Sequence, residues 1–141
     1  AVAGLRRLGR QSEISFAIPV ESMTPAAGQG SLLLQIRSDD EDALRAVDPI
    51  TDEAALRELT AERTVVALLE ATCTSPIGVH GKVDAQLERM RLEAFVGLPD
   101  GSEWIRDRVE GDSTEPTSLG AELAQRLLST GAHDILNRAE P

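Results

Sequence analysis

The chemically most distinctive group in this sequence is a single thiol. Cys73 lies in the decapeptide LEATCTSPIG (residues 69–78) and is the one cysteine among 141 residues. A lone cysteine in a soluble protein is most often a small buried apolar residue; the alternative is a nucleophile or an attachment point. Pro76 and Gly78 predict a turn directly after it, which would hold the thiol out on a fixed loop.

The predicted surroundings of Cys73 disfavour a thiolate that must act at every turnover. Such a thiolate is usually activated by a helix N-terminus or by a nearby cation. Cys73 instead follows the predicted C-terminal end of a helix, and Glu70 lies three residues before it. A thiol that reacts once and then stays modified remains compatible with these surroundings.

Other patterns that could carry chemistry are weak. His80 and His133 are far apart in the sequence and have neither an H-x-x-x-H spacing nor a cysteine partner, so no zinc site is predicted. Gly28-Gln29-Gly30 precedes a predicted strand, whereas a dinucleotide fingerprint precedes a helix. No G-x-S-x-G motif supports a serine nucleophile.

The acidic run Asp39 to Asp42 also needs no metal to explain it. Ser38 and Glu41 match a capping box that would start a short helix through about Val47. Acidic side chains in the first turn of a helix are favoured by the helix dipole. We therefore expect a helix N-terminus here and no cation site.

Composition narrows the possible partners. The chain has 24 acidic and 14 basic side chains, a net charge of −10, which disfavours non-specific binding to nucleic acid or anionic lipid. One Trp, two Phe and no Tyr leave little to stack on bases. Neither a long apolar run nor a signal peptide is recognisable. These features and the lone cysteine lead us to expect a cytoplasmic protein without a membrane span.

Before Pro49, the sequence predicts a helix and two strands in addition to the short helix that ends at about Val47. AVAGLRRLG (1–9) is typical of a helix ended by Gly9, and because it begins without Met or a capping residue we expect further chain before it. ISFAIPV (14–20) is a predicted strand. SLLLQIR (31–37) is predicted to be a strand buried on both faces.

After Pro49, the pattern is helix, three strands, helix. Thr51 or Asp52 would cap a helix over 53–70. Its predicted buried stripe consists of Leu56, Leu59, Val66 and Leu69. The predicted strands cover residues 79–85, 87–96 and 104–110, with a turn at Pro99-Asp100-Gly101 between the last two. In the second strand, the predicted packed face consists of Met90, Leu92, Ala94 and Val96. A last helix would start at Thr117 or Ser118, with Leu119, Leu123 and Leu127 stacked beside Leu128. Gly131 would interrupt it, and Ile135 and Leu136 would continue the packing.

This order predicts an α+β domain in which helices cover one face of a three-stranded antiparallel sheet. That architecture alone identifies no function.

The segment AERTVVALLEATCTSPIG (61–78) resembles the cofactor-attachment segment of porphobilinogen deaminase, also called hydroxymethylbilane synthase. AVAGLRRLG (1–9) is similar to a helix of that family's second domain, and TPAAGQGSLLLQIR (24–37) to the segment returning to its first domain. FVGLPDG (95–101) and LAQRLLSTGAHDIL (123–136) are similar to its third domain. The resemblance implies that residues 1–47 are a remnant of the α/β domains and that residues 48–141 form the C-terminal cofactor-attachment domain.

The resemblance implies a role for three residues. Cys73 would carry a dipyrromethane cofactor through a thioether, Arg7 would contact anionic pyrrole side chains, and Gln29 would lie beside the active-site cleft. The family's catalytic aspartate would lie in an N-terminal half that this chain lacks, so no catalytic residue is expected here. The chain departs from the family at Ala71 and Thr72, where a glycine or another small residue is usual, and at Ser75, where a β-branched residue is more common.

The implied function belongs to the whole enzyme. It is a transferase that deaminates and polymerises four porphobilinogen molecules into a linear tetrapyrrole for haem biosynthesis, through oligopyrrole intermediates on the cysteine-bound primer. The family would be monomeric, whereas a truncated chain with exposed apolar strands would self-associate and be inactive alone. The competing hypothesis is a non-catalytic acidic α+β binding module in which Cys73 is buried.

Overall fold

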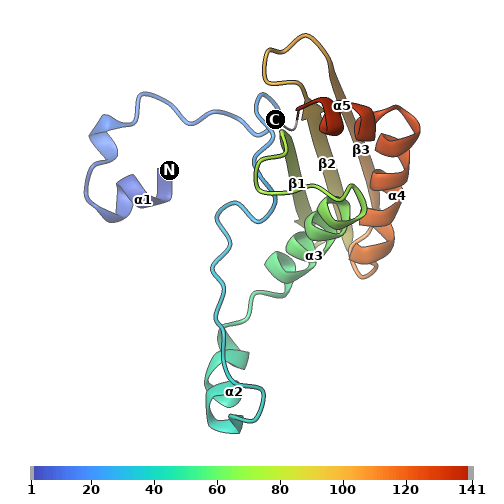
Figure 1. Ribbon diagram of the computed structural model, residues 1–141. Helices are drawn as coiled ribbons and strands as arrows, with labels where there is room; N and C mark the ends of the chain where they lie inside the picture. Colours follow the sequence, from blue (N-terminus) through green and yellow to red (C-terminus); the bar gives the residue numbers. More distant parts are fainter. Residues whose placement is uncertain (1, 140–141) are drawn as a thin grey trace.

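The computed structural model describes residues 2–139 and places most of its regular structure in one body (Figure 1). A three-stranded sheet and helices α3, α4 and α5 form this body, while α1 and α2 lie apart from it. The helices are α1 (Val2–Arg7), α2 (Glu41–Val47), α3 (Glu53–Leu68), α4 (Pro116–Ser129) and α5 (Ala132–Ala139), with short 3-10 turns at Gln11–Glu13 and Asp48–Ile50. The strands are β1 (Ile77–Asp84), β2 (Arg89–Gly97) and β3 (Trp104–Asp112).

The sheet has the order β1-β2-β3, and both pairs are antiparallel. Its register places Val79 opposite Ala94, and Leu92 opposite Val109. Between β2 and β3, the carboxylate of Asp100 accepts a hydrogen bond from the Ser102 amide at 3.0 Å, which shapes the predicted turn. The predicted α+β class is confirmed, as are the three strands.

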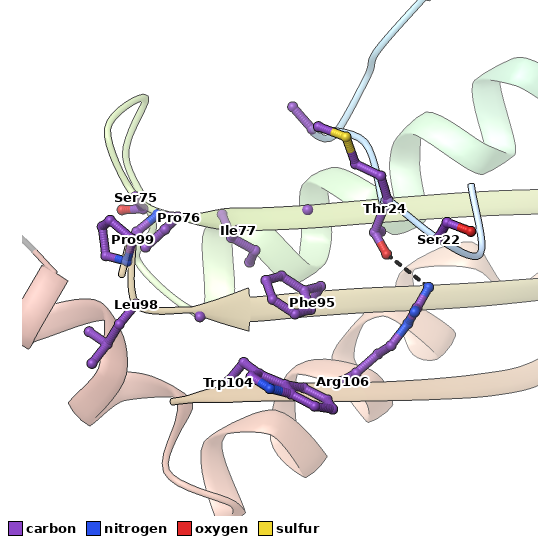
Figure 2. Close-up of a pocket in the computed structure, with 14 residues that line it drawn as sticks. Ser22, Thr24, Ser75, Pro76, Ile77, Phe95, Leu98, Pro99, Trp104 and Arg106 are labelled. Atoms are coloured by element: carbon purple, nitrogen blue, oxygen red, sulfur yellow. Dashed lines mark hydrogen bonds between the residues drawn. The ribbon is translucent and has the colours of Figure 1, made fainter. Parts of the chain in front are cut away.

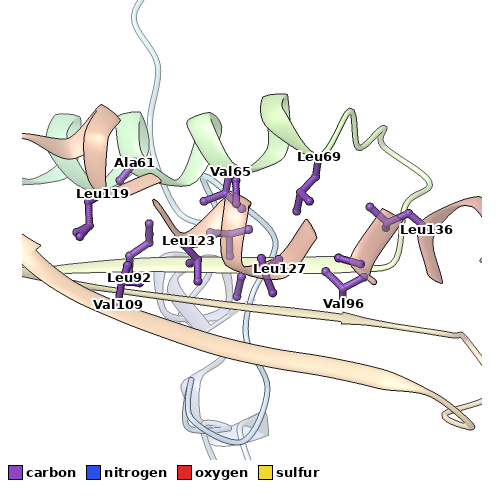
Figure 3. Close-up of a cluster of buried hydrophobic side chains, with 14 of the residues drawn as sticks. Ala61, Val65, Leu69, Leu92, Val96, Val109, Leu119, Leu123, Leu127 and Leu136 are labelled. Carbon is purple, nitrogen blue, oxygen red and sulfur yellow. The ribbon is translucent and has the colours of Figure 1, made fainter. Parts of the chain in front are cut away.

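The core lies between the helices and one face of the sheet (Figure 3). The predicted packed face of β2 is confirmed, because its four alternating side chains are all buried: Met90, Leu92, Ala94 and Val96. Helices α4 and α5 bury the predicted Leu119, Leu123, Leu127, Ile135 and Leu136. Burial of each large aliphatic side chain contributes about 1.5–3 kcal/mol to folding.

The predicted buried stripe of α3 is partly wrong. Leu69 is buried, but Leu56 is 50% exposed, and the residues that face the core are Ala61, Glu62 and Val65. The cause is a close crossing with α4, where a Cβ added to Gly120 would lie 2.6 Å from the carbonyl oxygen of Ala61. Small residues on both helices thus set which face of α3 turns inward.

The helix caps follow the prediction in α3 only. Asp52 caps α3 by accepting a hydrogen bond from the Ala55 amide at 3.0 Å. In α2 the cap is Asp40, which accepts from Ala43 at 2.9 Å, so the predicted capping box at Ser38 is wrong. Helix α4 starts at Pro116, whose fixed φ suits the first helical position.

The two strands predicted before Pro49 are wrong. Residues 14–20 and 31–37 carry no strand, and Leu32, Leu33 and Leu34 are 97%, 81% and 59% exposed. A strand exists only where a neighbouring strand pairs with its backbone. The structure contains no such neighbour for 31–37 within residues 2–139.

Residues 24–30 (TPAAGQG), here called the docked segment, lie against the body, whereas the stretch after Gly30 leads away from it. The amide of Val79 in β1 donates a hydrogen bond to the Pro25 carbonyl at 2.8 Å. Gly78 leaves the room for this approach, because a Cβ there would overlap the Thr24 carbonyl. The docked segment therefore belongs structurally to the C-terminal body.

Candidate functional site

Cys73 is exposed, on a turn between α3 and β1. The turn is braced by its own hydroxyl groups: the Thr72 amide donates to Ser75 Oγ at 2.8 Å, and the Ser75 amide donates to the Thr72 carbonyl at 3.2 Å. The Gly97 amide donates to the Pro76 carbonyl at 3.2 Å and ties the turn to β2. The buried-cysteine hypothesis is thus wrong, and the thiol stands on a fixed, solvent-accessible corner.

The helix before this turn ends in a Schellman motif. The Glu70 amide donates to the Ala67 carbonyl at 3.2 Å, and the Ala71 amide to the Val66 carbonyl at 3.1 Å. Glu70 takes a φ of 53°, the conformation that favours glycine. The position that needs glycine's freedom is therefore 70, because neither Ala71 nor Thr72 has a positive φ.

An open depression of about 670 Å³ lies beside this turn (Figure 2). Ser75 and Pro76 of the turn line it together with Thr24 of the docked segment. Its floor is the sheet face that the helices leave open, where Phe95 and Trp104 stack with ring centroids 6.0 Å apart. The depression thus offers flat apolar contacts next to the thiol-bearing turn.

The cation that lines the depression is already paired. The Arg106 guanidinium forms an ion pair with Glu93 and donates to Thr24 Oγ1 at 3.3 Å, the bond drawn in Figure 2. Thr24 Oγ1 in turn lies 3.2 Å from Glu93 Oε1. This network fixes the docked segment to β2 and β3, and it leaves little uncompensated positive charge for an anionic ligand.

Glu62 is a site residue that the helical pattern missed. It is 6% exposed; its Oε2 accepts from the Gly28 amide at 2.6 Å, and its Oε1 accepts from the Gly81 amide at 2.7 Å. Burial raises the pKa of Glu62, and its amide hydrogen bonds and the nearby His80 oppose the rise. His80 Nδ1 lies 3.7 Å from Glu62 Oε1, and the nearby Glu58 carboxylate raises the pKa of Glu62 further.

The other residues named from the sequence are not brought to the thiol. Arg7 is exposed at the end of α1, away from the body. Gln29 lies in the docked segment, where its amide donates to the Ala26 carbonyl at 3.0 Å. His133 is contacted by Asn137 at 2.9 Å on α5, whereas His80 lies on β1.

Neither a metal site nor a membrane span is found among residues 2–139. No three side chains of the His, Cys, Asp or Glu type in this range are placed to hold a metal ion. The acidic run is bound by arginines instead, with Arg45 2.5 Å from Asp42 and Arg37 3.8 Å from Asp40. The helices of this range are too short or too polar to cross a bilayer.

Two family models match the chain. Residues 56–129 match "Porphobilinogen deaminase, C-terminal domain", and residues 1–45 match "Porphobilinogen deaminase, dipyromethane cofactor binding domain". The second match lies outside the stretch that contains Cys73.

Curated relatives match almost the whole chain. The porphobilinogen deaminase of Pelotomaculum thermopropionicum is 41% identical over 139 residues, 99% of this chain and 44% of that protein. The enzymes of Thiobacillus denitrificans (39% over 137 residues) and Campylobacter concisus (37% over 142 residues) match 97% and 99% of the chain, and 44% and 45% of their own lengths. The chain therefore spans less than half the length of these relatives, and it belongs to the porphobilinogen deaminase family.

Proposed function

We propose that this chain is the part of a porphobilinogen deaminase that carries the covalent cofactor anchor, and that Cys73 is the attachment residue. The single observation that supports this most is the exposed thiol on the braced Thr72–Ser75 turn. We further propose that residues 48–141 are the attachment domain and that residues 1–47, apart from the docked segment, pack with the remaining chain of the enzyme. In the whole protein the substrate is porphobilinogen, the intermediates are oligopyrroles, and the compartment is the cytoplasm.

The residues present fit covalent attachment of a dipyrromethane. Attachment needs a soft nucleophile that a bulky electrophile can reach, and the exposed Cys73 sulfur meets both conditions. When bound, the dipyrromethane supplies a pyrrole carbon nucleophile as the primer for chain growth. The chain's own contribution is a fixed position for that primer.

The sulfur has to react only once. Its lone pair forms a bond to the methylene carbon of an aminomethylpyrrole, ammonia leaves with the electrons of the carbon–nitrogen bond, and the thiol proton goes to the leaving nitrogen. The thioether product cannot ionise. A site at a helix C-terminus, which does not favour a thiolate, is therefore no obstacle to this role.

The cations that bind the primer's carboxylates would come mainly from the rest of the enzyme. A primer with several carboxylates needs cations, but the chain carries a net charge of −10 and Arg106 is paired with Glu93. Arg7 is exposed on α1, which lies apart from the body, and it is free to face another part of the enzyme. Stabilisation of the positive charge that develops on pyrrole nitrogen would come from an aspartate outside this chain.

Intact-mass measurement tests the attachment. The full-length protein purified from cells should carry an adduct that is absent from Cys73→Ala, and ammonia release from porphobilinogen should be lost in the same variant. Ser75→Ala is the matched control, because it loosens the same turn and keeps the sulfur. Full activity without sulfur at position 73 would refute the proposal.

A further inference from the structure

Glu62 connects the docked segment, which carries Gln29, to β1. One of its carboxylate oxygens accepts from Gly28, next to Gln29 in the docked segment, and the other accepts from Gly81 in β1. Glu62 itself lies on α3, the helix that leads into the Cys73 turn. A single side chain thus joins the loop that carries Gln29 to both elements that flank the thiol.

The chemistry of this contact is unusual for an interior position. A buried carboxylate is costly unless its oxygens are hydrogen-bonded. Here both oxygens accept short, charge-assisted bonds from backbone amides 34 and 19 residues away in sequence. An apolar residue could fill the same space at a lower free-energy cost of burial, but it could not accept hydrogen bonds from two amides. The carboxylate therefore provides a connection that packing alone does not.

We propose that Glu62 is a positioning residue, whose carboxylate clamps the docked segment to the cofactor-bearing domain and so sets the place of Gln29 relative to Cys73. The inference rests on the proposed function for its catalytic consequence, and on the two hydrogen bonds for its structural one. Glu62 touches neither the thiol nor the depression beside it. It acts through the backbone of residues 24–30.

The structural arm of the test uses hydrogen exchange on the chain itself. Gln at position 62 keeps one acceptor and replaces the other with a donor, so one of the two amides loses its partner. Exchange in residues 24–30 should be about ten- to a hundredfold faster in Glu62→Gln, with exchange in β2 unchanged. In the unmutated chain, the Gly28 amide should exchange more slowly than the neighbouring Gly30 amide.

Glu58→Gln is the matched control. Glu58 lies one turn earlier on the same helix and also reaches β1, where it accepts from the Val83 amide at 2.8 Å and lies 3.6 Å from Lys82. It has no contact with the docked segment among the described hydrogen bonds. Equal exchange in both variants, or wild-type exchange in Glu62→Gln, would overturn the clamp. If Glu62→Gln does not fold, the comparison of the Gly28 and Gly30 amides still decides.

The catalytic arm uses the full-length protein. Glu62→Gln should keep the adduct on Cys73 and an unchanged KM for porphobilinogen, while kcat falls about ten- to a hundredfold because reacting groups are displaced. Glu58→Gln should keep kcat. If residues 24–30 exchange faster in Glu62→Gln but kcat is unchanged, the positioning role is refuted. If the unmutated protein showed neither an adduct on Cys73 nor ammonia release, both the proposed function and the positioning role would be refuted. The hydrogen-exchange data would still test whether Glu62 holds the docked segment in place.

Discussion

Replacing Glu70 by glycine should stabilise the body, because this residue combines two unfavourable features. It holds a left-handed backbone conformation with φ 53°, and it carries a negative charge at the C-terminal end of α3. A side chain in the left-handed region costs about 1–2 kcal/mol. An acidic group at a helix C-terminus costs about 0.3–1 kcal/mol, and an exposed one lies near the lower bound.

The gain in the free energy of unfolding is reduced because glycine makes the unfolded chain more flexible. Glycine loses about 0.5–1 kcal/mol more backbone freedom on folding than other residues do. The expected net increase in the free energy of unfolding for Glu70→Gly is therefore about 1 kcal/mol. Glu70→Gln keeps the backbone conformation and removes the charge, so it should gain only about 0.3 kcal/mol.

Urea unfolding followed by circular dichroism measures both variants without adding salt that would screen the charge. Glu88→Gly is a useful control, because Glu88 also has a positive φ (49°) but lies between β1 and β2, away from a helix end. It should gain about 0.5–1 kcal/mol from backbone relief alone. The reasoning fails if Glu70→Gly is no more stable than the unmutated chain, or if Glu70→Gln alone gives the whole gain.

Three further predictions concern the docked segment and the apolar stretch after it. Because the folded-state pKa of Glu62 is raised, its contribution to stability falls as pH rises from 4.5 through that pKa. Urea unfolding across this window should show Glu62→Gln gaining stability relative to the unmutated chain, and parallel pH curves would contradict this. Gly78→Ala should cost about 1–3 kcal/mol by overpacking and speed proteolysis in residues 24–30, whereas an unchanged cleavage rate would argue against close docking. The chain should associate as its concentration rises in sedimentation experiments, and Leu33→Lys should weaken this association; a monomer at all concentrations would refute it.

The C-terminal body could be predicted from the sequence because its signals are local. Alternation in β2 and the leucine spacing in α4 are each read within a dozen residues, and both are confirmed. The stretch 31–37 failed because an apolar run indicates burial but cannot supply the neighbouring strands that would bury it.

The site was predicted less completely for a similar reason. Cys73 stands out by its type, and the turn after it by Pro76 and Gly78. Glu62 falls within the segment 61–78 that carries the family resemblance, but the helical pattern gives it no special role, because the amides it binds are distant in sequence. The left-handed residue at the end of α3 is a glutamate, so no glycine marks it.

The docked segment also determines how the C-terminal body can move within the enzyme. Residues 31–51 leave the body after Gly30 and return to it where Asp52 caps α3. The chain also reaches the docked segment from α1, so three covalent connections join the body to the rest of residues 2–51. Three connections restrict rotation and sliding of the body more than a single linker would.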